Sequence, residues 1–168
     1  MATTYEAIAT VTVGSGGAAN IEFTSIPGTY TDLKLVISAR NTAVSGLVYF
    51  SFNGSTSSRS SRLLYGDGSA AGSVIYNNTD PRAMIMNESG YTASSFASGE
   101  MYIPNYAGSN NKSFSADSVQ ETNATTAYSY LMAGLWSNTA AITSITLTPF
   151  TGSFAQYSTA TLYGIKNS

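Results

Sequence analysis

The side chains that could carry out chemistry in this sequence are few, because two of the most useful types are missing. The chain has no Cys and no His. Without Cys, disulfides, thiolate chemistry and sulfur-ligated metals are excluded. Without His, the commonest general base and the commonest metal ligand are absent, so only carboxylates, Lys and Tyr remain for proton transfer.

The carboxylates do not form a recognisable catalytic pair. They are scattered along the chain as Glu6, Glu22, Asp32, Asp67, Asp80, Glu88, Glu100, Asp117 and Glu121. A glycosidase needs two carboxylates across its cleft, and no spacing here places two on one strand face. A pair of residues far apart in sequence stays open. We predict no catalytic residues and no enzyme.

Two loop segments could offer oxygen ligands to calcium, namely Gly66-Asp67-Gly68-Ser69 and Asn78-Thr79-Asp80. Neither has the regular acidic ladder of a known calcium loop. Asp and Asn are common in turns because their side chains cap the turn backbone, so turns are the favoured interpretation. Gly14-Ser15-Gly16-Gly17 is followed by no helix and no Lys, which indicates a hairpin connection and not a nucleotide loop. We predict no metal site and no cofactor.

Twelve Tyr and one Trp are the other candidates for binding. Aromatic faces stack on sugar rings and anchor protein interfaces. In segment 127–136 one face carries Tyr, Met and Trp, while the other carries Leu131 and Leu135. Burial of this strand on both faces is the favoured interpretation, and a subunit interface over one face is the alternative. Residues 162–165 pose the same choice.

Apolar and polar residues alternate with period two along nearly the whole chain, and no window shows the helical pattern. The clearest strand is 33–40, where Leu33, Leu35 and Ile37 share one face. The pattern predicts strands at 5–13, 19–24, 33–40, 47–52, 62–65, 73–76, 83–86, 100–103, 113–119, 127–136, 142–148 and 158–165. Only 87–97 could hold a helical turn, and we expect Ser55–Ser61 to be a mobile polar loop.

These elements predict an all-β fold, a two-sheet antiparallel β-sandwich of the jelly-roll type, in a single domain over residues 1–168. Many short strands with Gly and Asn breaks favour a sandwich or barrel, and one open sheet would leave two long exposed edges. The expected core comprises Ile21, Phe23, Leu33, Leu35, Ile37, Phe50, Phe52, Leu131, Leu135, Ile145, Leu147 and Leu162. We expect Leu35→Ala to be strongly destabilising.

The charge content argues against two classes of partner. Charged residues make up 10% of the chain, the formal net charge is −2, and no basic cluster occurs. Nucleic acid is therefore not an expected partner, because phosphate neutralisation needs a positive surface. No stretch has the length of apolar sequence that a membrane helix requires. Residues 1–5 do not have the pattern of a secretory signal, so we expect folding in the cytoplasm of the producing cell.

Two parts of the chain resemble virion structural proteins of tailed bacteriophages. The first runs from Ile21 to Arg40 (IEFTSIPGTYTDLKLVISAR), and the second comprises Leu135-Trp136-Ser137, Ile142–Leu147 and Thr161–Ile165. Together they cover under half of the chain and carry no known active-site residue. The resemblance implies a β-sandwich used as a capsid decoration (cement) protein, a head fibre or a tail-fibre domain.

The leading functional expectation is a capsid decoration protein located in the virion, which stabilises the shell through contacts with the major capsid protein or other virion proteins. The resemblance suggests a homotrimer, and low net charge favours association. We expect Tyr and Met at the trimer centre and hydroxyl residues at its rim. The alternative is a domain of a head or tail fibre that binds a host glycan or receptor.

Overall fold

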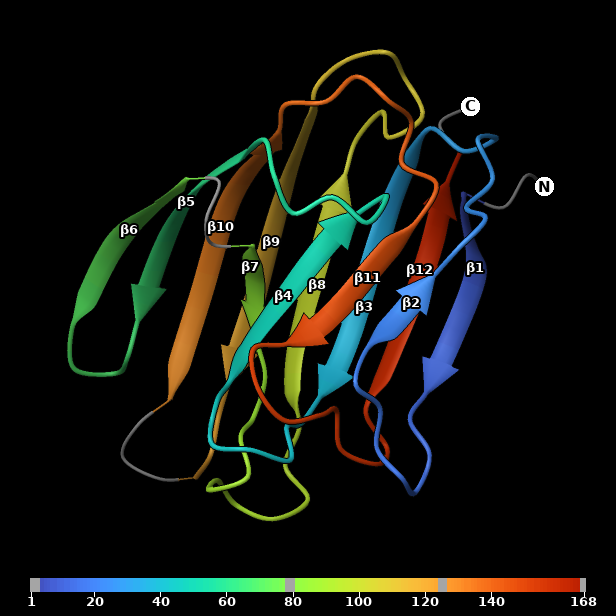
Figure 1. Ribbon diagram of the computed structural model, residues 1–168. Helices are drawn as coiled ribbons and strands as arrows, with labels where there is room; N and C mark the ends of the chain where they lie inside the picture. The colour runs from blue at the N-terminus through green and yellow to red at the C-terminus, as the bar shows by residue number, and fades with distance from the viewer. Residues whose placement is uncertain (1–3, 78–80, 124–126, 167–168) are drawn as a thin grey trace.

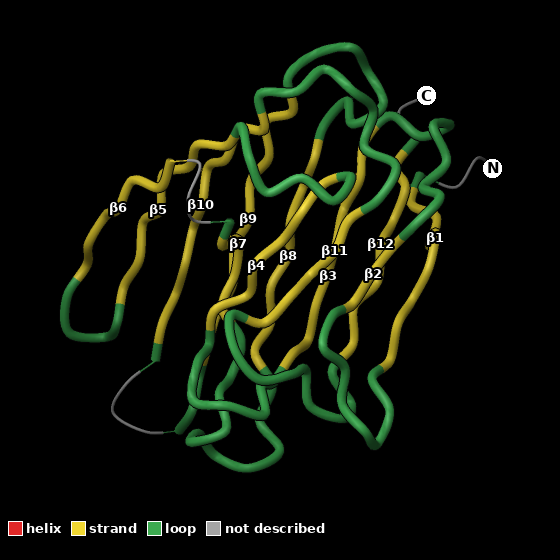
Figure 2. Tube along the Cα trace, viewed as in Figure 1, coloured by secondary structure: helices red, strands yellow, loops and turns green. Residues whose placement is uncertain are grey.

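The computed structural model describes residues 4–77, 81–123 and 127–166, which form twelve β-strands and no helix (Figure 2). The absence of helix within these residues agrees with the period-two pattern. No helix in the described part of the chain could cross a membrane. Segment 87–97 has turns instead of a helical turn, with Tyr91 N–H donating to Glu88 O at 3.1 Å.

The strands form two antiparallel sheets that pack face to face (Figure 1). The larger sheet has eight strands in the order β1 (Tyr5–Thr12), β12 (Thr159–Ile165), β3 (Asp32–Ala39), β8 (Ala97–Ile103), β9 (Lys112–Gln120), β10 (Tyr128–Trp136), β5 (Arg59–Gly66) and β6 (Ala71–Asn77). The smaller sheet has the order β2 (Ile21–Phe23), β11 (Ile145–Pro149), β4 (Leu47–Phe52) and β7 (Arg82–Ile85). The predicted two-sheet β-sandwich is confirmed, and its jelly-roll connection stays a prediction.

The smaller sheet covers only part of the larger one. In Figure 1, β5 and β6 lie at the left of the larger sheet, beyond the edge strand β7 of the smaller sheet. The two faces of the larger sheet therefore differ in how far they are covered. The inner face is covered over β12, β3, β8 and β9, while none of the described strands forms a second layer on the outer face.

Strict alternation places the core between the two sheets. Along β9, every second residue from Lys112 to Gln120 is buried and the residues between them are exposed. Ten of the twelve predicted core residues are buried: Ile21, Phe23, Leu33, Leu35, Ile37, Phe50, Phe52, Ile145, Leu147 and Leu162.

The predictions for Leu131 and Leu135 are wrong. Leu131 is 55% exposed and Leu135 is only half-buried, because both lie on the outer face of β10. Met132 and Trp136, on the other face of this strand, are buried. The interpretation that β10 is buried on both faces is therefore wrong for this chain.

An aromatic cluster joins the two sheets. Phe50 and Phe52 on β4 contact Phe114 on β9 with ring centroids 5.1 and 5.8 Å apart, and Phe52 lies 5.6 Å from Trp136. Most of these rings meet edge to face, which is the arrangement that their quadrupoles favour. The cluster fixes the distance between the sheets where β9 and β10 leave the central core.

The segment Ser55–Ser61 is not a loop throughout, because β5 begins at Arg59. The Arg59 guanidinium is buried, lies 4.3 Å above the Phe50 ring, and donates to Phe50 O at 2.6 Å and to Ser55 O. Burial lowers the pKa of Arg59 to about 10. The serine-rich composition of this segment did not indicate that the Arg59 side chain contacts β4 from β5.

Candidate functional site

The outer face of the larger sheet carries a polar centre. Glu100 on β8 lies directly opposite Asp117 on β9, and Lys34 Nζ on β3 lies 2.7 Å from Glu100 Oε2. Beside them, the Tyr102 hydroxyl donates to Asp32 Oδ2 at 2.6 Å. Open hollows of about 50 and 320 Å³ border the two opposed carboxylates.

The pairing of Glu100 with Asp117 is a long-range carboxylate pair that the sequence left open. Opposed like charges on neighbouring strands repel each other, and the Lys34 ammonium offsets that repulsion. Hydrogen bonding to Glu100 raises the pKa of Lys34. The two carboxylates project side by side from one sheet face, whereas a glycosidase holds its pair on either side of a bound sugar.

An exposed apolar area lies next to this polar centre, which we call the apolar patch. It consists of Leu64 on β5, Ile75 on β6, Val119 on β9 and Leu131 on β10, which are 58%, 59%, 49% and 55% exposed. Leu131 lies directly opposite Leu64 in the β10–β5 register, and the other two are diagonal neighbours. The patch is therefore continuous across four adjacent strands.

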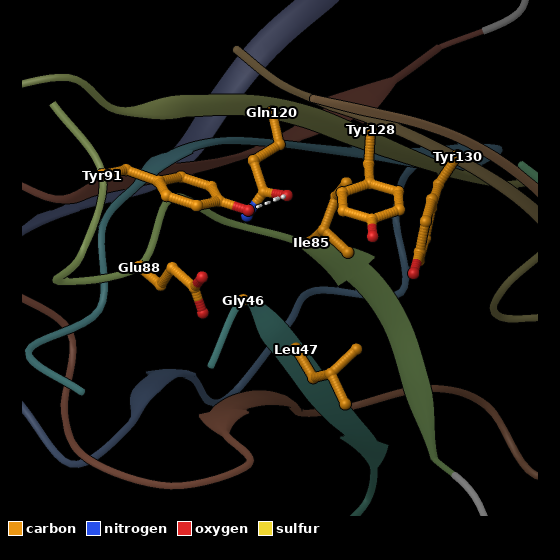
Figure 3. A pocket seen from close by; sticks show the side chains of 8 residues that line it. All are labelled: Gly46, Leu47, Ile85, Glu88, Tyr91, Gln120, Tyr128 and Tyr130. Carbon is orange, nitrogen blue, oxygen red and sulfur yellow. Dashed lines mark hydrogen bonds between the residues drawn. The ribbon is translucent and has the colours of Figure 1, made fainter. Parts of the chain in front are cut away.

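A second candidate site is a cavity on the inner face, which we call the tyrosine cavity. It has a volume of about 470 Å³ and lies where β10 runs beyond the edge of the smaller sheet. Its lining residues are Gly46, Leu47, Ile85, Glu88, Tyr91, Gln120, Tyr128 and Tyr130 (Figure 3). This volume is within the usual range for small-molecule sites.

Two elements position the aromatic walls of the cavity. Tyr128 and Tyr130 point to the same face because they are two residues apart on β10, and their rings meet at 81° with centroids 6.2 Å apart. Tyr91 comes from the loop after β7. Figure 3 shows Tyr91 across the cavity from this pair, with Glu88 on the same side of the cavity as Tyr91.

Gln120 is held rigidly at the back of the cavity. Its side chain is 4% exposed, its Nε2 donates to Met86 O at 2.6 Å, and its Oε1 accepts from the Tyr91 hydroxyl at 3.4 Å. Gly46 makes this approach possible, because a Cβ there would lie 2.6 Å from Gln120 Nε2. A larger residue at position 46 would displace the amide.

Tyr91 and Tyr130 of the cavity stay protonated at neutral pH. Burial raises the pKa of Tyr91, and the charge of Glu88 raises it further. Burial also raises the pKa of Tyr130. Their hydroxyls are therefore neutral groups that can both donate and accept hydrogen bonds.

The loops considered for calcium have different outcomes. Asp67 Oδ1 accepts from Ser69 N–H at 2.9 Å and from Ala70 N–H at 2.7 Å, which caps the β5–β6 turn and lowers the pKa of Asp67. This confirms the turn interpretation there. Within the described residues, no three Asp or Glu side chains gather as a metal site would require. Asn78-Thr79-Asp80 lies outside the described residues.

Sequence reasoning missed Lys112, the first residue of β9. Its side chain is 1% exposed, and its Nζ donates to Gly108 O at 2.7 Å, to Asn110 O and to Thr139 O at 3.4 Å. Burial lowers the pKa of this amine. The contacts join two loops at one end of the sandwich, and no sequence pattern distinguishes this Lys from an exposed one.

Comparison of the chain with protein-family models gives no match, and comparison with curated proteins gives none either. The function is therefore argued from the apolar patch and the tyrosine cavity.

Proposed function

We propose that this chain is a structural protein of a tailed-bacteriophage particle, a capsid decoration protein that acts through protein–protein contacts and not as an enzyme. The observation that carries the proposal is the apolar patch. Four exposed apolar side chains lie close together on adjacent strands, and exposed apolar patches often mark an interaction surface. The phage context itself comes from the resemblance of residues 21–40, 135–137, 142–147 and 161–165.

The apolar patch is suited to contact between copies of the chain. Arg62 is exposed on β5 directly opposite Ile75, and Asp117 is exposed on β9 directly opposite Leu131, so both charges border the patch. In a cyclic assembly, Arg62 of one subunit paired with Asp117 of the next would add charge complementarity to an apolar contact. We assign the patch to the subunit contact of a homotrimer, which then binds the major capsid protein.

The path of the chain supports the jelly-roll part of the fold prediction. Successive strands alternate between the sheets from β1 to β4, and again from β10 to β12. Such crossings between two sheets are what a jelly roll contains. The hairpin β5–β6 then extends the larger sheet beyond the area that the smaller sheet covers.

Location within the particle tests this function. Antibodies against the purified chain are used to label phage particles, which are then imaged by electron microscopy. Label over the head supports the decoration role. Label at the tail tip favours the fibre alternative, and particles that contain none of the chain contradict both.

Capsid binding can be tested separately with matched variants. The double variant Leu64→Ser/Leu131→Ser should lose stable association with purified capsids, because it removes the centre of the patch. Val44→Ser is the control, since Val44 is 76% exposed but lies in the loop before β4. Equal capsid binding by both variants would contradict the role of the patch.

The second candidate function is a domain of a head or tail fibre that binds a glycan or receptor. The tyrosine cavity is the specific observation that favours it. The two functions use different faces of the larger sheet and are compatible in one molecule.

A further inference from the structure

We propose that the tyrosine cavity is a binding site for a neutral oligosaccharide. The cavity opens on the inner face of the larger sheet, whereas the apolar patch occupies the outer face of the same strands. The inference therefore goes beyond the decoration role and does not depend on it. Its chemistry follows from the walls, the polar groups and the charge of the cavity.

The aromatic walls continue as a row along the sheet. Tyr128 lies next to Tyr130, and Tyr130 lies 6.2 Å from Tyr65 on β5, measured between ring centroids. The C–H groups on one face of a pyranose ring form an apolar surface that packs on such rings. A row of rings provides stacking positions for several linked sugars. A small cation would instead require rings that converge on one point.

The polar groups suit the hydroxyls of a sugar. The Glu88 carboxylate points into the cavity (Figure 3) and can accept charge-assisted hydrogen bonds. The Tyr128 and Tyr130 hydroxyls line the same space and can donate or accept. Gln120 is fixed by Met86 O and Tyr91, so this wall of the site is already ordered before a ligand binds.

Charge selects against acidic ligands. Among the eight lining residues, Glu88 is the one acidic side chain, and neither Lys nor Arg is present. Arg82 on β7 is nearby, but its guanidinium stacks 4.4 Å above the Tyr76 ring and donates to the Tyr76 hydroxyl at 2.9 Å. A phosphate, sulfate or sugar carboxylate would therefore meet the negative charge of Glu88 within the cavity.

The test uses the full chain, isotope-labelled for protein NMR, and soluble oligosaccharides as probes. Neutral hexasaccharides of glucose, mannose and N-acetylglucosamine are compared with a sialylated oligosaccharide, a hexauronate and tetramethylammonium. We expect at least one neutral hexasaccharide to shift signals of the cavity residues with a Kd of about 1 mM or tighter. Tyr128→Ala should weaken that binding about fivefold, because one stacking contact is lost.

Two further variants keep the test decisive. Tyr5→Ala is the matched control, because Tyr5 is a 51% exposed tyrosine on β1 at the opposite side of the larger sheet. It should leave sugar binding unchanged. Glu88→Gln keeps the side-chain size and should weaken binding through loss of the charge-assisted hydrogen bond, even if Tyr128→Ala does not fold.

The proposal is overturned if no neutral hexasaccharide binds, if only the acidic probes or tetramethylammonium bind, or if Tyr5→Ala loses as much affinity as the cavity variants. The Leu64→Ser/Leu131→Ser protein separates this outcome from the decoration role. We expect it to bind sugar normally, since its substitutions lie on the outer face. Loss of capsid binding in this variant would then leave the sugar site unaffected. Loss of sugar binding in the cavity variants would likewise leave the decoration role unaffected.

Discussion

Leu35 on β3 and Leu131 on β10 are leucines in strands of the same sheet, yet the first is 0% exposed and the second is 55% exposed. We expect Leu35→Ala to lower the free energy of unfolding by about 2–5 kcal/mol, through lost burial and the cavity that remains. Leu131→Ala should change it by less than about 0.5 kcal/mol in the monomeric state. Urea unfolding of both variants at low protein concentration measures the difference, and equal losses would contradict the assigned faces.

Tyr102 gives a pH-dependent prediction. Its hydroxyl donates to the buried Asp32 carboxylate, which raises the pKa of Tyr102 to about 12 from an ordinary value of 10.0. Between these two values the folded state keeps the proton while the unfolded state loses it, so this contribution to stability falls as pH rises.

Tyr102→Phe should therefore lower the free energy of unfolding by about 1.5–3 kcal/mol below pH 10, which is the usual range for a hydrogen bond to a charged group. The difference between the two proteins should narrow as pH rises toward 12. Urea midpoints measured at intervals of pH give both quantities. A difference that stays constant with pH would show that the Tyr102–Asp32 bond does not cause it.

For single residues, the sequence predicted burial well where a strand is covered on one face only. Ile37 and Leu147 follow from alternation alone, and both are buried. Lys112 and Arg59 could not be predicted, because their burial depends on how the neighbouring loop carbonyl groups turn toward them and, for Arg59, on a ring of another strand. Local pattern contains no information on such partners.

The positions of the strands were predicted more accurately than which of their faces are covered. Segment 47–52 matches β4 at both ends, and most other strands begin or end within a few residues of the expected positions. The error on β10 has a definite physical origin. Apolar residues on both faces of a strand are equally consistent with burial between two layers and with an exposed contact surface, and only the number of layers distinguishes them.

The β5–β6 turn gives the prediction on metal. Because Asp67 Oδ1 is used by backbone N–H groups of its own turn, we expect EDTA to leave the melting temperature unchanged. A bound ion would stabilise the folded state by mass action, so its removal would lower the melting temperature. Calorimetry with and without the chelator checks this. A fall of several degrees that added calcium reverses would identify a metal site.

For the molecule as a whole, the sequence predicted two sheets but neither candidate site. The tyrosine cavity depends on the smaller sheet ending at β7 while the larger one continues to β6. The lining residues come from segments as distant as Leu47 and Tyr130, so no spacing in the sequence brings them together. Abundant Tyr indicated the kind of binding and not its position.

The expected trimer also needs correction in its details. Met84, Met86, Met101 and Met132 are the methionines among the described residues, and all four are buried in the core and not on an outer surface. Exposed Leu, Ile and Val side chains lie close together on the outer face of β5, β6, β9 and β10. These residues, with Arg62 and Asp117 beside them, now define the surface that should meet a neighbouring copy.

We expect light scattering of the purified chain to give the mass of three copies, about 53 kDa from 17.6 kDa per chain. Leu64→Ser/Leu131→Ser should give a monomer, since two adjacent leucines at the centre of the patch are lost, whereas Val44→Ser should stay trimeric.

High salt should weaken the contact modestly if Arg62 meets Asp117 of the next subunit, because exposed ion pairs are screened. A monomeric parent chain that still binds capsids would keep the decoration role and exclude the trimer. A double variant that remains trimeric would move the subunit contact away from the patch, and the outer face of β5, β6, β9 and β10 would then be free to meet the capsid itself.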